Sequence, residues 1–402
     1  MSLPCSLHIT PFRIITFNAY FCRHFNPNDL KNFEKLGIRK DLIKGLNELN
    51  IITPTDIQSE VIQVLLNNNT DLVGQAQTGT GKTAAYGLPL LQRIDPKLNE
   101  IQALILCPTR ELGQQVAKQL FKFTKYTEKI FTEAVYGGAK IENQISALRR
   151  PTHIVVATPG RLLDLVRRKA IDIRRVETIV LDEADEMLSM GFKKDLNEIL
   201  QLVNTVKSKW LFSATMPHEI KQIVNEHLSP DAHRIETSTK NVVNQNIEHQ
   251  FVICEGADKL QALLQFLKSQ QNNRGVVFCK TKAATQVLAK QLIAKNIAAD
   301  AIHGDLLQKE RDKVMRAFKN EKLQILIATD LAARGIDIEA LAYVVHYQLP
   351  DKEEYYTHRS GRTARAGKKG ISLCIVTSPE MKQIKYFEKA LGIGFSQIRQ
   401  VR

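Results

Sequence analysis

Two patterns are missing from this sequence: paired cysteines and a long apolar run. Its six cysteines form no C-x-x-C pair, and three of them lie in the apolar segments "LILC", "VVFC" and "SLCIV". We therefore expect small buried thiols in a reducing compartment, which favours the cytoplasm. No uninterrupted apolar run approaches the roughly 20 residues that cross a bilayer, which argues against a membrane-spanning role.

Acidic residues are absent from the first 28 positions, which carry Arg13 and Arg23 among several aromatic residues. Transit and signal peptides share this composition. However, Arg13 interrupts the apolar stretch and no small-residue cleavage site follows it. We interpret residues 1–30 as a loose N-terminal extension, and the sequence leaves open whether it is retained.

Length and charge narrow the class of protein. A chain of 402 residues with 44% hydrophobic content exceeds the usual size of one domain, so two domains are expected. The formal net charge of +14 and a pI near 9.4 indicate a polyanionic partner, either nucleic acid or an anionic membrane. Charge alone does not distinguish these partners.

Short apolar runs alternate with helical patterns from about residue 31, which predicts an α/β fold with parallel sheets covered on both faces. The runs lie at 104–108, 153–159, 178–185, 209–215, 275–280, 298–304, 324–330, 343–350 and 371–377. Between the two groups, residues 229–250 are polar with little periodicity. We place a first domain at 31–236, a linker at 237–246, a second domain at 247–395 and a tail at 396–402.

The segment "AQTGTGKT" (76–83) lies between an apolar strand-like run and a helical pattern. A strand, a glycine-rich turn and a helix N-terminus together surround a phosphate chain with backbone N–H groups. Gly79, Gly81, Lys82 and Thr83 fit the phosphate-loop pattern, with Lys82 for the β- and γ-phosphates and Thr83 for Mg²⁺. Ala76 replaces the first glycine of that pattern. The second half of the chain has no such loop.

A phosphate loop needs an acidic partner for its metal, and "IVLDEAD" supplies one. Asp182 ends the apolar run, so we expect its carboxylate to face the phosphates and hold Mg²⁺ directly or through water. Glu183 follows and is the candidate to orient or deprotonate the attacking water. Read alone, these acids could begin a solvated helix; next to a phosphate loop they indicate a nucleotide hydrolase.

The segment "HRSGRTARAG" (358–367) places arginines at 359, 362 and 365 among small residues. By itself it could be a solvated basic turn. It is the last of eight motifs in a fixed order, after "AQTGTGKT", "PTREL" (108–112), "TPGR" (158–161), "DEAD" (182–185), "SAT" (213–215), "HGD" (303–305) and "ATDLAARGID" (328–337).

In this order the motifs resemble those of the DEAD-box RNA helicases, over about residues 33–390. The resemblance implies two tandem RecA-like domains with a cleft between them, which bind ATP, Mg²⁺ and RNA. It also implies an adenine-reading site. Gln58 in "TPTDIQ" would bond the base edge, and Phe33 would stack on the base unless it is a core residue. Asn50 and Ile51 stand where the family commonly has a glycine and an aromatic residue.

The family adds further nucleotide contacts and residues that couple ATP to domain movement. Thr78 and Thr80 complete the phosphate loop, and Asp337 would meet the ribose. Ser213, Thr215, Arg334 and His358 would couple the domains, although "SAT" alone could be a packing feature. Arg362 and Arg365 match the arginine-finger positions, while His358 and Arg359 would also hold their motif in place.

Two residues in this motif depart from the family, which usually shows an aliphatic residue at Ser360 and glycine at Ala364. The alanine costs little if its backbone is helical and much more if φ is positive. The sequence leaves these alternatives open.

Glycines, threonines and arginines at the carboxyl ends of strands predict a ligand edge, because strand ends in an open α/β sheet share one edge. Such groups suit a sugar-phosphate backbone and carry no base code. The resemblance implies that they hold single-stranded RNA without sequence preference, and each could instead serve a turn or cap. The candidates are Arg110, Gly138, Gly160, Arg161, Gly304, Arg311 and Thr329.

The expected activity is RNA-stimulated ATP hydrolysis coupled to local, non-processive separation of short duplexes or remodelling of RNA–protein complexes. Two alternatives stay open: an ATP-gated RNA clamp whose hydrolysis only times release, and a processive DNA translocase. A non-catalytic structural protein fits least well with a complete phosphate and metal site. The family implies a mostly monomeric core, and the sequence discloses neither protein partners nor the RNA target.

Overall fold

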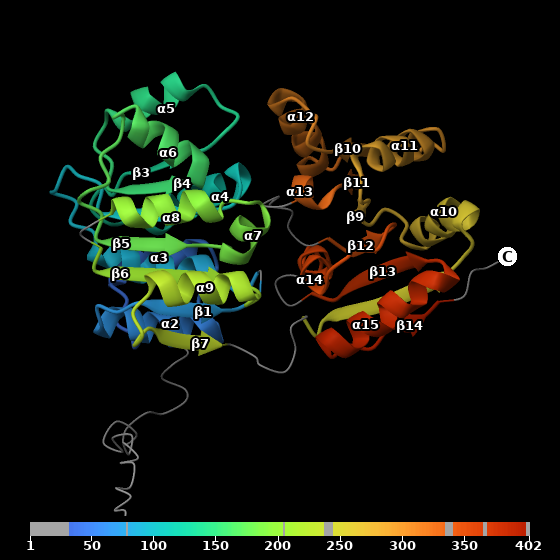
Figure 1. Cartoon of the computed structure of the whole chain (residues 1–402), viewed down its shortest axis with the longest axis horizontal. Helices are drawn as coiled ribbons and strands as arrows, with labels where there is room; N and C mark the ends of the chain where they lie inside the picture. The colour runs from blue at the N-terminus through green and yellow to red at the C-terminus, as the bar shows by residue number, and fades with distance from the viewer. Residues whose placement is uncertain are drawn as a thin grey trace, which may run out of the picture.

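The computed structural model describes residues 32–77, 79–203, 206–236, 244–333, 341–364 and 368–398. Figure 1 shows two lobes side by side, each built on a parallel sheet with helices on both faces. This arrangement confirms the predicted α/β class with two RecA-like domains. Among the described residues no helix is long and apolar enough to span a bilayer.

The first sheet has seven strands in the order β3-β4-β2-β5-β6-β1-β7, all parallel. Its inner strands are fully buried, which explains why they appear as unbroken apolar runs in the sequence. The strands are β1 (Leu72–Gln75), β2 (Ala103–Leu106), β3 (Thr132–Val135), β4 (Ile154–Ala157), β5 (Thr178–Leu181), β6 (Ser208–Ser213) and β7 (His233–Glu236).

Helices cover both faces of this sheet, so two hydrophobic clusters form, one on each side. One cluster is covered by α1 (Lys40–Glu48), α2 (Asp56–Asn67), α3 (Lys82–Arg93) and α4 (Arg110–Phe123). The other is covered by α5 (Ile141–Leu148), α6 (Pro159–Arg167), α7 (Ala184–Ser189), α8 (Lys193–Leu202) and α9 (His218–His227).

The second sheet repeats this plan with strand order β10-β11-β9-β12-β13-β8-β14. Its strands are β8 (Ile247–Ile253), β9 (Gly275–Phe278), β10 (Ala299–Ile302), β11 (Ile325–Ala328), β12 (Tyr343–His346), β13 (Gly370–Val376) and β14 (Ser396–Gln397). Its helices are α10 (Lys259–Ser269), α11 (Lys282–Ile293), α12 (Gln308–Lys319), α13 (Asp330–Ala333), α14 (Glu353–Ser360) and α15 (Met381–Leu391). In Figure 1, α13 and α14 face α7 of the first domain.

Four strands were not predicted from the sequence: β3, β7, β8 and β14. Polar residues mask β3 and β7, which lie at the two edges of the first sheet, where one side of a strand meets solvent. The polar stretch at 229–250 contains β7 and the start of β8, two strands that its composition did not reveal, and the linker placed at 237–246 lies between them. β14 also extends the second sheet past the proposed domain end at residue 395.

Candidate ATP site and interdomain cleft

The phosphate loop follows β1 and opens α3, as the sequence indicated. Gly79 and Gly81 have φ of 83° and 91°, a conformation that favours glycine. Ala76 is not among the residues with positive φ, so its β-carbon is tolerated where the general pattern has glycine. Lys82 is buried and donates from Nζ to the Ala76 carbonyl at 2.8 Å, which folds the loop around the lysine.

Gln58 braces this loop. Its Nε2 donates to the Gly81 carbonyl at 3.1 Å, and its Oε1 accepts from the Thr55 N–H at 3.0 Å. The Thr55 hydroxyl donates to the Thr80 carbonyl at 2.9 Å, so the two neighbours hold consecutive loop residues. A β-carbon on Gly81 would come within 2.2 Å of Gln58 Nε2, so only glycine fits there. Gln58 is therefore a support of the phosphate loop, whatever its role toward a base.

Phe33 is 2% exposed and packs in the hydrophobic cluster on the α1–α4 face of the first sheet. A ring that stacks on a base must offer one open face, and this ring offers none in the described conformation. The burial favours the core role for Phe33 over base stacking, the alternative that the sequence had left open.

Asp182 follows β5 and lies in the middle of this site. Its Oδ2 accepts a hydrogen bond from the hydroxyl of Tyr86 at 2.8 Å. Tyr86 lies on α3, one turn after Lys82. Burial raises the pKa of Asp182 to about 6, while the charge of Lys82 lowers it and Glu183 raises it further. A buried carboxylate with too little compensating positive charge suits a divalent cation, because Mg²⁺ favours the ionised form. Asp182 therefore fits the predicted role of a metal ligand, and Thr83 as its companion stays a prediction.

Glu183 begins α7 in a left-handed backbone conformation, with φ 52° and ψ 53°. Such a conformation is strained for a non-glycine residue and persists where the surrounding structure imposes it. Glu183 is 8% exposed and directly adjoins Asp182. The local turn thus holds both acids of "DEAD" at the end of the same strand.

Asp185 connects this site to the second domain. Its Oδ2 accepts from the Thr215 N–H at 2.9 Å and from the Thr215 hydroxyl at 2.7 Å. The same oxygen lies 3.4 Å from Nε2 of His358, on α14 of the second domain. The Ser213 hydroxyl donates to the Thr215 carbonyl at 2.6 Å. Three of the four predicted coupling residues are therefore brought together, with Asp185 between them.

The charges in this contact reinforce each other. Burial alone would lower the pKa of His358, but Glu186, Asp185 and Glu183 outweigh it, and the pKa is raised. His358 Nδ1 lies 3.1 Å from Glu186 Oε1. Burial would raise the pKa of Asp185, yet His358, Lys82 and Thr215 hold it well below its usual range. The raised pKa favours the protonated form of the imidazole, whose two nitrogens lie near two buried carboxylates of the first domain.

The arginines of the last motif have different surroundings. Arg359 is 2% exposed and donates to Asp330 Oδ2 at 2.7 Å and to the Gln348 carbonyl at 2.8 Å, so it holds α14 against its own domain. Arg362 is 7% exposed, donates from Nε to the His358 carbonyl at 3.3 Å, and lines a small pocket with Glu186. Arg362 is thus held at the cleft, near Glu186, the residue that follows "DEAD".

The backbone at Ala364 answers the alternative that the sequence left open. Its φ is 56°, in the left-handed region, so the alanine is strained where glycine would not be. Its side chain is 1% exposed and packs in a hydrophobic cluster, and its carbonyl accepts from Asn244 Nδ2 at 2.8 Å. Tight packing and this hydrogen bond hold the unfavourable conformation.

Two of the predicted RNA contacts pair with acids across the cleft. Arg311 donates from Nε to Glu111 Oε1 at 2.8 Å, and Arg110 Nη2 lies 3.7 Å from Asp312 Oδ2. Each domain thus contributes one arginine and the acid next to it in sequence. Arg311 also donates to the Ala332 carbonyl at 2.7 Å within its own domain, so it links α12 and α13 to Glu111 of the first domain.

The remaining candidate RNA residues of the first domain lie near the ends of β3 and β4. Arg161 donates to Gln144 Oε1 at 2.9 Å and to the Ala139 carbonyl at 3.1 Å, which secures the turn that contains Gly138. Gly138 has φ 79°, and Gly160 lies in the first turn of α6.

In the second domain, Gly304 and Thr329 follow β10 and β11, and Thr329 is 8% exposed. These positions fit the predicted ligand edge. Thr78, Arg334, Asp337 and Arg365 lie outside the described residues.

Sequence reasoning missed several residues of this site. The clearest are Tyr86, Glu111, Asp185 and Asp312. Tyr86 stands four residues after Lys82 on a helix, a spacing that places both on one face. Each of the three acids contacts a residue of the other domain, and a local sequence pattern does not reveal such a contact.

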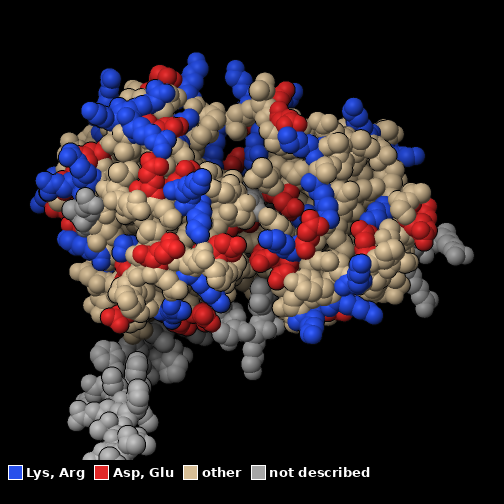
Figure 2. Space-filling model, viewed as in Figure 1, with Lys and Arg blue, Asp and Glu red and all other residues tan. Residues whose placement is uncertain are grey.

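Positive charge is spread over both lobes in the view of Figure 2, with Asp and Glu interspersed. This face shows no single-sign stripe that would identify a nucleic-acid path by itself. The predicted RNA residues are accordingly supported by their place at strand ends rather than by a charged surface.

Comparison with known proteins places these features in a family. The model for the DEAD/DEAH box helicase matches residues 55–223, and the model for the helicase conserved C-terminal domain matches residues 258–367. The chain is 41% identical over 360 residues to the DEAD-box ATP-dependent RNA helicase CshA of Bacillus cereus, covering 90% of this chain and 68% of that one. It is 42% identical to ATP-dependent RNA helicase CshA of Listeria monocytogenes, covering 90% and 69%.

Solved structures agree in fold. Dbp5 of S. cerevisiae bound to RNA and ADP BeF3 is 31% identical, with a TM-score of 0.85 over 92% of this chain and 96% of that one. A DEAD box protein of Methanococcus jannaschii is 41% identical over 91% of this chain and 99% of that one, with a TM-score of 0.54. The chain belongs to the DEAD-box family of ATP-dependent RNA helicases.

Proposed function

We propose that this protein is an RNA-stimulated ATPase that separates short RNA duplexes locally, without processive translocation. The contact of Thr215, Asp185 and His358 carries the proposal, because it joins the ATP site to the second domain through buried charged groups. The arrangement of the whole chain also matches the Dbp5 structure with RNA and ADP BeF3 better than it matches the Methanococcus structure, with TM-scores of 0.85 and 0.54, although the sequence identity to Dbp5 is lower. This similarity supports a closed arrangement of the domains.

In the proposed mechanism, the phosphate loop and Lys82 hold the phosphates of ATP, and Asp182 with Thr83 hold Mg²⁺, which neutralises charge on the phosphates. Glu183 orients or deprotonates the attacking water. Arg362 and Arg365 supply positive charge to the reacting phosphate when the cleft closes. Such arginines are worth about 10³ to 10⁵ in rate in other NTPases.

RNA lies across both domains in this proposal and is held by its backbone. Arg110, Arg161, Arg311 and the turn glycines make the contacts, so binding is independent of sequence. Closure holds one strand in a bent path that a duplex does not fit, and the partner strand is released. Contacts present only in the closed state drive this change as a shift in population.

The cellular compartment and the oligomeric state are also part of the proposal. The four described cysteines 107, 254, 279 and 374 are free and buried, which fits a reducing compartment such as the cytoplasm. We propose a monomeric core, as the family implies.

Steady-state ATPase assays with single-stranded RNA and with single-stranded DNA test the proposal. We expect strong stimulation by RNA and little by DNA; equal stimulation would refute the RNA assignment. Strand displacement by Glu183→Gln separates a helicase from a clamp, because a clamp would keep its activity when hydrolysis is blocked. Arg365→Ala should remove most ATPase activity while ATP binding stays near that of the unaltered chain. Loss of ATP binding would contradict the finger role.

A further inference from the structure

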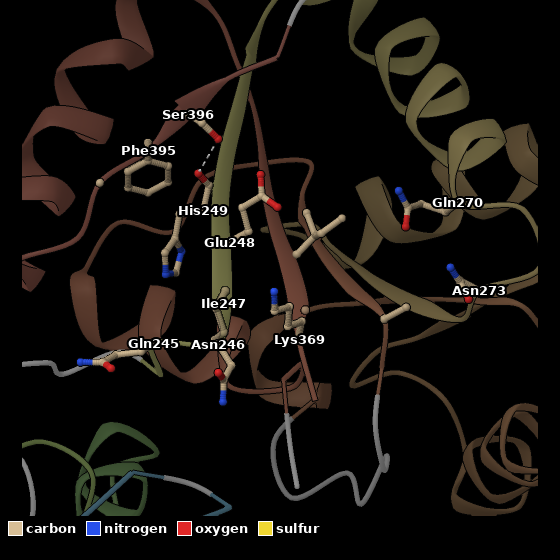
Figure 3. A pocket seen from close by; sticks show the side chains of 14 residues that line it. Gln245, Asn246, Ile247, Glu248, His249, Gln270, Asn273, Lys369, Phe395 and Ser396 are labelled. Atoms are coloured by element: carbon tan, nitrogen blue, oxygen red, sulfur yellow. Dashed lines mark hydrogen bonds between the residues drawn. The ribbon is translucent and has the colours of Figure 1, made fainter. Parts of the chain in front are cut away.

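A second cavity lies far from the ATP site, at the amino ends of the strands of the second sheet (Figure 3). The proposed RNA residues Gly304 and Thr329 follow the carboxyl ends of strands, so the cavity opens at the opposite edge. Its walls come from the start of β8, the start of β13, the end of α10 and the turn before β14. They are lined by Gln245, Asn246, Ile247, Glu248, His249, Gln270, Asn273, Ala342, Lys369, Gly370, Ile371, Gly394, Phe395 and Ser396.

One wall of this cavity is an incompletely paired strand. β8 pairs with β13 along its whole length, from Ile247 to Ile253. On the other side, β14 pairs only with Gln250 and Phe251. Residues 247–249 of β8 therefore have a strand partner on one side only within the described chain. An edge of this kind is a template for another extended segment.

The backbone groups at this edge point in the direction that a further strand would need for hydrogen bonding. The Asn246 carbonyl accepts from the Gly370 N–H, toward β13, while the Phe251 carbonyl accepts from the Ile398 N–H, toward β14. Because successive residues of a strand point to alternate neighbours, the Ile247 carbonyl and the His249 N–H face the open side. The Ser396 hydroxyl reaches the His249 carbonyl at 3.3 Å and marks where β14 takes over (Figure 3).

The side chains around the edge suit a polypeptide better than a polyanion. Four carboxamides line the cavity, from Gln245, Asn246, Gln270 and Asn273, and each can both donate and accept hydrogen bonds. One carboxylate, Glu248, and one ammonium group, Lys369, balance in charge. RNA backbone binding needs several cations, and among the described residues that line this cavity Lys369 alone carries a full positive charge. Peptide groups match the carboxamides and the open strand edge together.

The cavity wall and its neighbour Asn244 make three close approaches to α14 and the arginine motif that follows from it. His249 Nδ1 lies 2.6 Å from the hydroxyl of Tyr356, on α14 two residues before His358. Asn244, next to the cavity residue Gln245, donates to the Ala364 carbonyl. Gly370 lies so close to the motif that a β-carbon there would come within 2.0 Å of Thr363 Oγ1.

We propose that this cavity binds an extended peptide segment of a partner protein, which adds a strand to β8 beside residues 247–249. The peptide orders the start of β8, with His249, and the segment before it, with Asn244, and so steadies the strained backbone at Ala364 and the helix α14. Occupied, the site favours the arrangement in which the arginines act, and RNA-stimulated hydrolysis rises. The proposal goes beyond the helicase function and names a site by which a partner protein adjusts it.

The test selects peptides from a phage-displayed library of random ten-residue sequences on the full chain. Counter-selection uses Asn273→Trp, which fills the cavity from an exposed position, and Lys295→Trp is the matched control at an exposed position of the same domain outside the cavity. We expect enriched peptides to bind the unaltered chain and Lys295→Trp alike and Asn273→Trp at least tenfold more weakly. Bound peptide should slow hydrogen exchange at the amides of residues 247–249 and raise RNA-stimulated kcat at least twofold.

Glu248→Arg provides a second variant if Asn273→Trp melts below the control, since it changes the charge of the cavity at an exposed position. The proposal is overturned if no peptide is enriched, if peptides bind the cavity variants as well as the control, or if kcat does not change when they bind. ATPase assays without peptide judge the helicase function separately. A chain that binds peptide with protection at 247–249 but shows no stimulation by RNA would refute the proposed function and leave the docking site standing.

Discussion

Two aspartates of the "DEAD" segment, three residues apart and both buried, should respond in opposite directions to the same substitution. The pKa of Asp182 is raised to about 6, so folding favours its neutral form. The pKa of Asp185 is held below its usual range, so folding favours its charged form. Asparagine resembles a neutral aspartate in shape. Asp182→Asn should therefore stabilise the chain, and Asp185→Asn should destabilise it.

The magnitude for Asp182 follows from linkage. With a pKa of 3.8 in the unfolded chain and about 6 in the folded one, the native state binds more protons between these values, so stability falls as pH rises through that window. The cost of the charged form is about 1.6 kcal/mol at pH 5 and about 3 kcal/mol at pH 7.5. Asp182→Asn removes this cost, which in a domain of this size is worth about 6–12 °C in Tm at pH 7.5.

The assay is thermal unfolding of the full chain at pH 5 and pH 7.5, in a chelator and without nucleotide, so that no metal stabilises the carboxylate. The advantage of Asp182→Asn should roughly halve at pH 5. Asp185→Asn is the matched control and should lose about 3–5 kcal/mol at pH 7.5, because it breaks a buried ion pair. If Asp182→Asn proved no more stable than the unaltered chain at pH 7.5, the inference that the charged form of Asp182 destabilises the chain when no cation is bound would be wrong. Its ATPase activity should be lost in either case.

Three further outcomes are expected. Ala364→Gly should change the free energy of unfolding by less than about 1 kcal/mol. It relieves about 1–2 kcal/mol of backbone strain, but it loses about 0.8 kcal/mol of methyl burial and raises the entropy of the unfolded chain. Ala364→Val should lower the free energy of unfolding by about 2 kcal/mol or more, as measured with a denaturant. Arg311→Glu should weaken RNA-stimulated ATPase at least tenfold, and Glu111→Arg in the same chain should restore part of it; no rescue would show that the pair does not hold the closed cleft. Phe33→Ala should lower stability by about 3–5 kcal/mol as a core residue, whereas Phe33→Leu should leave the KM for ATP within twofold, and a large rise in KM would restore the stacking role.

Much of the fold could be predicted because inner strands of a parallel sheet are buried on both faces. The runs at 178–185 and 275–280 contain β5 and β9, whose residues are all buried. The edge strands failed this criterion: β7 is "HRIE", with three of its four residues exposed. An edge strand is defined by its hydrogen bonds to one neighbouring strand rather than by burial, and the local sequence does not show which strand that neighbour is.

The residues of the candidate site also fall into a group that could be predicted from the sequence and a group that could not. The phosphate loop and Asp182 could be predicted because their residues are contiguous and their chemistry depends on local geometry. The partners across the cleft could not be predicted, because Glu111 and Arg311 lie 200 positions apart in the sequence and meet only in the folded chain. The strain at Ala364 was posed as a question by the sequence and answered only by its backbone angle.

The crossed pairing of Arg110 with Asp312 and of Arg311 with Glu111 neutralises four charges between the domains, while Lys118, Arg316 and Lys319 line the same pocket and keep it positive. Because the paired groups are partly buried, salt screens them less than it screens exposed charges. RNA binding releases counterions, and its affinity falls with salt by a log–log slope of about 0.7 for each phosphate neutralised on a single strand. The same arginines thus serve two partners with different sensitivity to ionic strength. Rising salt should therefore weaken the binding of RNA more than it weakens the contact between the domains.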